Sequence, residues 1–206
     1  MLYQLVTSSA RALVTIWHIW RSDWGTYVAP ESQTHYTRLA IALHWVIALL
    51  VFALFAIGWN MVDLPRGPDR SFNFALHKSL GLTVFGLAVV RSVWRVLHPP
   101  PPYHKSVARW RVTIARSAHL LFYVVLFLQP ASGYLSSSFS GYATRIFGIS
   151  LPQWGWRDPP LNELFTELHV ASSVLLIVLI CIHVLGALSH GFNRGDGVLR
   201  RILPWC

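Results

Sequence analysis

The chain has 206 residues, of which 54% are hydrophobic and only 12% are charged, and its formal net charge is +9. Soluble globular domains carry about 25% charged residues, so this composition excludes an ordinary soluble domain and indicates an integral membrane protein. The basic residues gather in alternate connections between apolar segments, which favours a membrane protein with no nucleic-acid partner.

Residues 1–35 form an amino-terminal extension before the first long apolar segment. The stretch from Leu2 to Trp20 is biased toward apolar residues but is interrupted by Arg11 and His18. No small-residue cleavage site follows, so a secretory signal peptide fits poorly. Two alternatives remain for this extension: an amphipathic helix lying at the cytoplasmic membrane interface, or a segment without regular structure.

Four long apolar segments follow, and each is close to the ~20 residues that cross about 30 Å of hydrocarbon. None of these segments contains Asp or Glu. The sequence therefore predicts an all-α integral membrane four-helix bundle, which occupies residues 36–206 as one domain. The predicted spans are Leu39–Met61, Phe74–Arg95, Ala118–Ser136 and Leu168–His190.

Basic residues are distributed unequally between the two sides of this bundle. If both termini and the second connection share one side, that side carries twelve Lys and Arg against three acidic residues, whereas the other side carries five of each kind. An excess of Lys and Arg is typical of cytoplasmic connections. We therefore expect both termini to face the cytoplasm.

Four histidines lie inside the predicted spans, where ionisable side chains are costly and indicate function. His44 in the first span and His183 in the last lie toward the cytoplasmic side, whereas His77 in the second span and His169 in the last lie toward the opposite side. The fourteen residues between the two histidines of the last span correspond to a rise of about 21 Å and a return to within about 40° of the same helix face. The depths therefore predict two pairs, His44 with His183 and His77 with His169.

Each predicted pair suits the two axial positions of a b-type haem, because neutral imidazole is a good ligand for haem iron. Zinc is disfavoured, because two histidines per site fall short of its usual four ligands. His119, in the third span, is followed one turn later by Tyr123, and we expect it to be a packed residue or to lie at a haem edge. One turn after each proposed ligand stands a small residue that would let a flat macrocycle approach the helix, namely Ala48, Gly81, Ser173 and Ala187.

Several strings of the sequence resemble the bacterial cytochrome b561 family, in matching order and spacing over about residues 36–204. They are YTRLAIALHW, HKSLG followed by VVRSVWRVLHPPP, AHLLFYVVLFLQPASGYL, and LHVASSVLLIVLICIHVLGALSHGFNRGDGVLRRILP. The resemblance implies a di-haem cytochrome b domain in the bacterial inner membrane. It also implies that the same four histidines bind the cofactor and its metal, namely His44, His77, His169 and His183. One departure is His190-Gly191, where relatives can have two consecutive histidines.

A member of that family oxidises periplasmic superoxide and reduces ubiquinone, so the resemblance implies a superoxide:quinone oxidoreductase embedded in the lipid bilayer. Superoxide needs a cluster of cations on the outer side, and Lys78 beside His77 is the first candidate, with Arg66, Arg70, Arg145 and Arg157 as further members. Quinone needs protons and hydrogen-bond donors near the cytoplasmic surface, for which the candidates are Arg91, Arg95, His119 and His190.

An alternative function is a haem-b membrane anchor that relays electrons between a partner dehydrogenase or hydrogenase and the quinone pool. The four-helix cytochromes that anchor hydrogenases are similar in architecture, and the long connection Ser137–Glu167, with Trp154 and Trp156, could dock such a redox partner protein. A homo-oligomer is equally compatible with the sequence. A third interpretation, a non-redox helical protein, predicts colourless protein.

Overall fold

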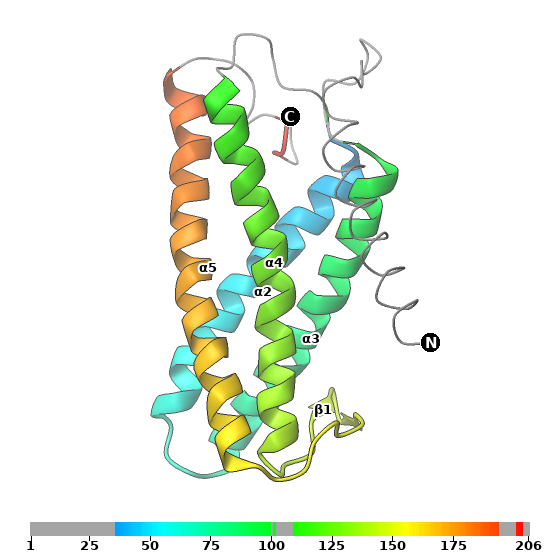
Figure 1. Cartoon of the computed structure of the whole chain (residues 1–206), viewed down its shortest axis with the longest axis vertical. Helices are drawn as coiled ribbons and strands as arrows, with labels where there is room; N and C mark the ends of the chain where they lie inside the picture. The colour runs from blue at the N-terminus through cyan, green and yellow to red at the C-terminus, as the bar shows by residue number, and fades with distance from the viewer. Residues whose placement is uncertain (1–35, 100, 102–108, 194–200, 204–206) are drawn as a thin grey trace, which may run out of the picture.

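The computed structural model of the protein describes residues 36–99, 101, 109–193 and 201–203, with the side chains of residues 190–193 outside this set. Each of its four long helices is long and apolar enough to cross a membrane. The predicted all-α membrane four-helix bundle is therefore confirmed (Figure 1). The helices are α2 (Arg38–Asp63), α3 (Pro68–Leu97), α4 (Arg109–Phe139) and α5 (Pro159–Asn193). The predicted extension, residues 1–35, lies outside the described residues.

Every helix extends beyond its predicted apolar segment, because the added turns carry polar residues that need not lie in hydrocarbon. Local signals define the starts of the helices. The Thr37 side chain accepts a hydrogen bond from the Ala40 amide at the start of α2 (3.3 Å), and the Asp158 carboxylate accepts one from the Leu161 amide at the start of α5 (3.1 Å). Such side chains pair backbone N–H groups that have no partner within the helix.

The helices pack in chain order, α2 on α3, α3 on α4 and α4 on α5 (Figure 1). No Cα atom of α5 lies within 8 Å of a Cα atom of α2 or α3. Large apolar side chains cover much of the outside of the bundle, as expected of helices that face lipid. The buried apolar layer at the centre draws on all four helices and consists of Ile47, Val51, Val84, Val125, Leu176 and Leu179.

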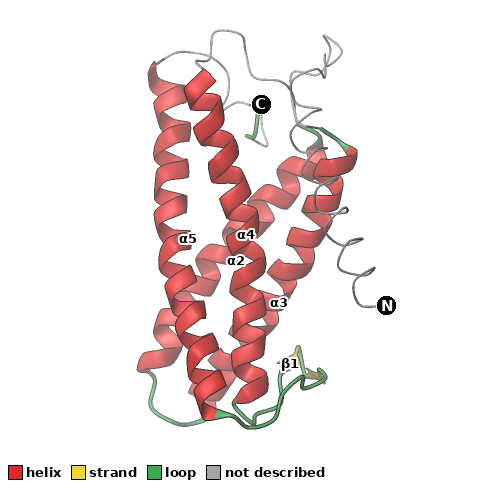
Figure 2. Ribbon diagram, in the orientation of Figure 1, coloured by secondary structure: helices red, strands yellow, loops and turns green. Residues whose placement is uncertain are grey.

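The start of α2 and the end of α5 lie at the same end of the bundle, which we call the terminal end (Figure 1). The described C-terminal residues lie there too, since the Trp45 indole nitrogen donates to the Ile202 carbonyl at 2.8 Å. The opposite end, called the hairpin end, carries a short antiparallel ribbon formed by β1 (Arg145–Ile146) and β2 (Ile149–Ser150) (Figure 2).

The ribbon turns at Phe147 and Gly148, whose φ angles are 47° and 89°. Two consecutive residues with positive φ are typical of the tight hairpin turn that matches strand twist. The Phe147 amide donates to the Ser79 hydroxyl of α3 at 3.0 Å, and the Tyr134 hydroxyl of α4 donates to the Pro152 carbonyl. The connection between α4 and α5 therefore folds against the hairpin end of the bundle.

Candidate functional site

Two pairs of histidines face each other across the bundle. The ring centroids of His77 in α3 and His169 in α5 are 6.1 Å apart, and those of His44 in α2 and His183 in α5 are 6.3 Å apart. We call them the hairpin-end pair and the terminal-end pair. Each pair joins two helices that do not pack directly on one another. The structure thus brings together the same two pairs that depth in the sequence predicts.

The separation within each pair fits two imidazoles on opposite sides of one metal ion. A metal–imidazole bond is about 2 Å long and the ring nitrogen lies about 1.1 Å from the ring centre, so two ligands in line place their centres about 6.2 Å apart. Among the described residues, no group of three or more His, Cys, Asp or Glu side chains is placed to hold a metal ion. A metal at either pair would take two ligands from the described residues, which suits haem iron, since the porphyrin supplies the others.

The backbone of α4 holds the ring of His169. Its Nδ1 donates to the Gln129 carbonyl at 2.8 Å, which leaves a lone pair on Nε2. An added Cβ at Gly133 would lie 3.0 Å from both Nδ1 and Cε1 of this ring, so any other residue there would press the ring away from the helix backbone. Metal-binding histidines commonly donate their second ring N–H to a carbonyl in this way, which fixes the tautomer and the ring orientation.

The backbone of α2 meets His77 in a similar manner. An added Cβ at Gly58 would lie 3.3 Å from Cε1 and 3.6 Å from Nδ1 of this ring. The buried Nδ1 faces the backbone of Leu54 but has no hydrogen bond of ordinary geometry to any described residue. Leu54 precedes Gly58 by four residues, as Gln129 precedes Gly133. Beside the next turn of α3 the space is open, since an added Cβ at Gly81 would meet no atom within 4 Å.

His183 also contacts α4, where the ring centroids of His119 and Phe122 lie 5.6 and 5.3 Å away. The Nδ1 atom of His119 is buried and has no hydrogen-bond partner in the described part of the chain. Because α4 and α5 pack directly, the contact of His119 with His183 lies between adjacent helices, whereas His44 reaches His183 from α2, whose Cα atoms all lie more than 8 Å from those of α5. This placement agrees with the expectation that His119 packs beside the pair.

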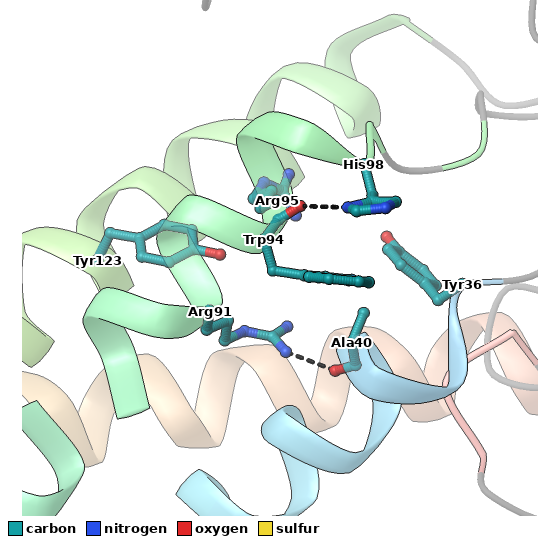
Figure 3. Close-up of a pocket in the computed structure, with 7 residues that line it drawn as sticks. All are labelled: Tyr36, Ala40, Arg91, Trp94, Arg95, His98 and Tyr123. Carbon is teal, nitrogen blue, oxygen red and sulfur yellow. Dashed lines mark hydrogen bonds between the residues drawn. The ribbon is translucent and has the colours of Figure 1, made fainter. Parts of the chain in front are cut away.

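Arg91 and Arg95 of α3 line a pocket at the terminal end (Figure 3). The Arg91 guanidinium donates through Nη1 to the Ala40 carbonyl at 2.7 Å, and the Arg95 guanidinium lies over the Tyr123 ring, 5.9 Å from its centroid. None of the lining residues is acidic; the others are Tyr36, Trp94 and His98. His190 lies in α5, but its side chain is outside the described set.

Lys78 lies at the hairpin end, directly after His77 in α3. Its ammonium group donates to the Ser137 hydroxyl at 2.8 Å, and the Thr144 hydroxyl donates to the same oxygen at 2.7 Å. Ser137 and Thr144 are both buried, and Lys78 is half-buried between α3 and the connection. The other cations predicted at this end are exposed or bonded locally: Arg66, Arg145 and Arg157 are exposed, and Arg70 donates to the Leu64 carbonyl at 3.3 Å.

Sequence reasoning missed the residues that support the histidine rings from neighbouring helices, above all Gly58, Gly133 and Gln129. A weak signal was present, because glycine inside a helix costs about 1 kcal/mol relative to alanine and a glycine in a span often has a packing reason. Which ring each glycine meets depends on how the helices are rotated, and the sequence contains no signal for that rotation.

Four membrane-crossing helices with histidines paired at two depths define a helical membrane haem protein. The chain belongs to the prokaryotic cytochrome b561 family, whose family model matches residues 35–205, and the resemblance noted from the sequence is confirmed. Membership makes it a multi-pass bacterial membrane protein that binds b-type haem and transfers electrons.

Three relatives match most of the chain. Cytochrome b561 homolog 2 of Escherichia coli (strain K12) is 32% identical over 183 residues, which are 84% of this chain and 93% of that relative. The probable superoxide oxidase CybB of Yersinia pestis is 25% identical over 172 residues (82% and 96%). Cytochrome b562 of Cereibacter sphaeroides is 26% identical over 177 residues (82% and 94%).

Proposed function

We propose that residues 36–206 bind two haems b, one between His77 and His169 and one between His44 and His183, and carry electrons across the inner membrane from superoxide to ubiquinone. The observation that carries this proposal is the matched separation within the two pairs, 6.1 and 6.3 Å, at two levels of one bundle. Bound haem would supply a one-electron couple at each level. The name of the Yersinia relative, a probable superoxide oxidase, supports superoxide as the donor.

We assign the terminal end of the bundle to the cytoplasm and the hairpin end to the periplasm. The charges support this orientation, because cytoplasmic ends of membrane helices carry the excess of Lys and Arg. At the hairpin end five basic residues are matched by five acidic ones. At the terminal end the charged residues that the structure describes are all basic, namely Arg38, Arg91, Arg95, Arg109, Arg111, Arg116 and Arg201.

On the periplasmic side, Lys78 is the residue proposed to attract superoxide. Its ammonium group lies one residue from His77, and its only recorded partner among the described residues is the neutral Ser137 hydroxyl. Within the described part of the chain no carboxylate pairs with this ammonium group, and a fixed cation in a half-buried position raises the local concentration of an anion. Each superoxide gives up one electron and leaves as O2.

On the cytoplasmic side, the pocket of Arg91 and Arg95 is proposed to receive the quinone head group. Its guanidinium and phenol groups can donate hydrogen bonds to the two carbonyl oxygens of a quinone at this surface. Arg91 also lies close enough to His44 and His183 to interact electrostatically with both, so the pocket adjoins the terminal-end pair. Two electrons and two protons are needed for each quinol. A role of His119 and His190 in supplying protons or hydrogen bonds to the quinone stays a prediction.

The decisive experiment measures superoxide consumption by purified, haem-quantified protein with and without added ubiquinone. The proposal expects two haems per chain and consumption that depends on quinone. Two haems without superoxide consumption would refute the assigned donor and support the membrane-anchor alternative. Folded protein that binds no haem would refute both.

A further inference from the structure

Gln129 of α4 contacts α5 through both its backbone and its side chain. Its carbonyl accepts from Nδ1 of His169 at 2.8 Å and from the Ser132 hydroxyl at 3.0 Å. Its side-chain oxygen accepts from the Ser172 hydroxyl, one turn further along α5 from His169. Its side-chain nitrogen lies 3.2 Å from Nε2 of His169. One residue thus connects both ring nitrogens of the histidine to the neighbouring turn of the same helix.

This contact is buried and is specific to the hairpin-end pair. Ser132 and Ser172 are only 1% and 4% exposed, so water does not compete for these hydrogen bonds. His77, the other member of the pair, has no hydrogen bond of ordinary geometry at Nδ1 to any described residue. The geometry of the pair is therefore set mainly from the side of His169.

We infer that Gln129 is a positioning residue for the hairpin-end pair, a role that rests on the haem site proposed above. Its carbonyl fixes the tautomer and the angle of the His169 ring and leaves Nε2 as the nitrogen that would bind haem iron, and the bond from Ser172 holds the Gln129 side chain beside that atom. A carbonyl acceptor on the far ring nitrogen makes the imidazole a stronger base and so favours the ferric ion. The bond from Ser172 to the Gln129 side chain holds α4 and α5 in the register that keeps this carbonyl on Nδ1. Loss of the side chain should therefore loosen the hydrogen bond to the ring and raise the midpoint potential at this level of the bundle, with the other level unchanged.

Gly133 also helps to position the His169 ring, through its lack of a side chain. Gly133 stands one turn after Gln129, and an added Cβ there would press on the His169 ring at 3.0 Å, closer than nearly all real Cβ contacts. At Gly58 the corresponding distance to the His77 ring is 3.3 Å, so the ring would need to move less to accommodate an added Cβ. At Gly86 an added Cβ meets nothing within 4 Å. The three glycines therefore form a graded series.

The test uses full-length protein and measures haem content, the midpoint potential of each haem, and the electron paramagnetic resonance of the ferric haems, which reports imidazole orientation. Gln129→Leu should weaken retention of the hairpin-end haem by about ten- to a hundredfold, as is typical when the support of a metal ligand is lost. It should also raise the potential of that haem and change its resonance. Ser172→Ala should act in the same direction but less. Ser189→Ala removes a hydroxyl that donates to the Gly186 carbonyl of its own helix at 2.7 Å, and should change nothing.

The glycine series adds an independent arm, in which Gly133→Ala shifts the resonance of the hairpin-end haem most, Gly58→Ala less, and Gly86→Ala not at all. If Gln129→Leu fails to fold, Ser172→Ala decides the question alone. Wild-type protein with two haems whose potentials are unchanged in Gln129→Leu and Ser172→Ala, or are shifted equally, would overturn the inference while leaving the proposed function intact. Wild-type protein without a haem at His77 and His169 would instead overturn the proposed function itself.

Discussion

Replacing His169 by alanine should remove one haem and leave the second unaltered. The two histidines of α5 are fourteen residues apart, a rise of about 21 Å, and a buried apolar layer from all four helices lies between the two pairs. Sites more than about 7–10 Å apart that share no partner respond additively to mutation. The haem content should therefore fall from two per chain to one in His169→Ala, to one in His183→Ala, and to zero in the double variant.

Haem is counted by absorbance against protein concentration, and the spectrum of the haem that remains identifies which level was lost. Two matched controls come from histidines outside the pairs. His98, which is exposed and stacked on Trp94 at 3.7 Å, and His119, which packs beside His183, should each be replaceable by alanine with both haems retained. Retention of both haems in His169→Ala, or loss of one in His119→Ala, would refute the assigned pairs.

Three further substitutions test separate parts of the molecule. Lys78→Gln should slow the reduction of the haems by superoxide about tenfold and make the rate of this reduction less dependent on salt, because a cation that attracts superoxide is lost. Stopped-flow measurements of the haem spectrum can show both effects. Arg91→Gln should raise the KM for quinone about tenfold, since a charged hydrogen bond is worth about 1.5–3 kcal/mol, and steady-state kinetics would measure it. Trp45→Phe removes the bond to the Ile202 carbonyl, worth about 1 kcal/mol, and should make the C-terminal tail more sensitive to limited trypsin digestion.

Each of these variants has a control at the same end of the bundle. Arg66→Gln removes an exposed cation at the hairpin end, Arg38→Gln removes an exposed cation outside the pocket, and Trp110→Phe changes a tryptophan at the terminal end that is 61% exposed. A control that slows superoxide oxidation, raises the KM for quinone or frees the tail as much as its partner variant does would show that the effect comes from general charge or packing.

Span number and helix type could be predicted from the sequence because membrane helices need about 20 apolar residues, and that requirement is visible without any tertiary information. The residues at which the helices begin and end could not be predicted in this way. The α4 helix begins at Arg109 rather than near Ala118, since polar turns outside hydrocarbon continue a helix as readily as apolar ones. The ribbon around Phe147 and Gly148 was also missed, because strands of two residues have no hydrophobic period.

The proximity of the histidines in each pair followed from depth alone, since antiparallel helices place residues at equal distance from a membrane surface at the same level. Their supporting residues required the rotation of each helix. Gly133 and Gln129 stand nearly forty residues before His169, and only the packed α4–α5 interface shows that they meet its ring. The same rotation brings His119 against His183, a contact that helical depth suggests but does not establish.

The apolar layer between the two histidine levels has an electrical consequence. Its valine, leucine and isoleucine side chains offer no group that could carry a proton, so this layer favours the transfer of an electron alone between haems at the two levels. In the proposed orientation that electron moves toward the negative side of an energised membrane. Crossing about 21 Å of a 30 Å hydrocarbon core costs about 1.6 kcal/mol per 100 mV, or roughly 70% of the full transmembrane value. The protein would therefore work against the membrane potential, and the rate of electron transfer to quinone in sealed vesicles should rise when that potential is collapsed.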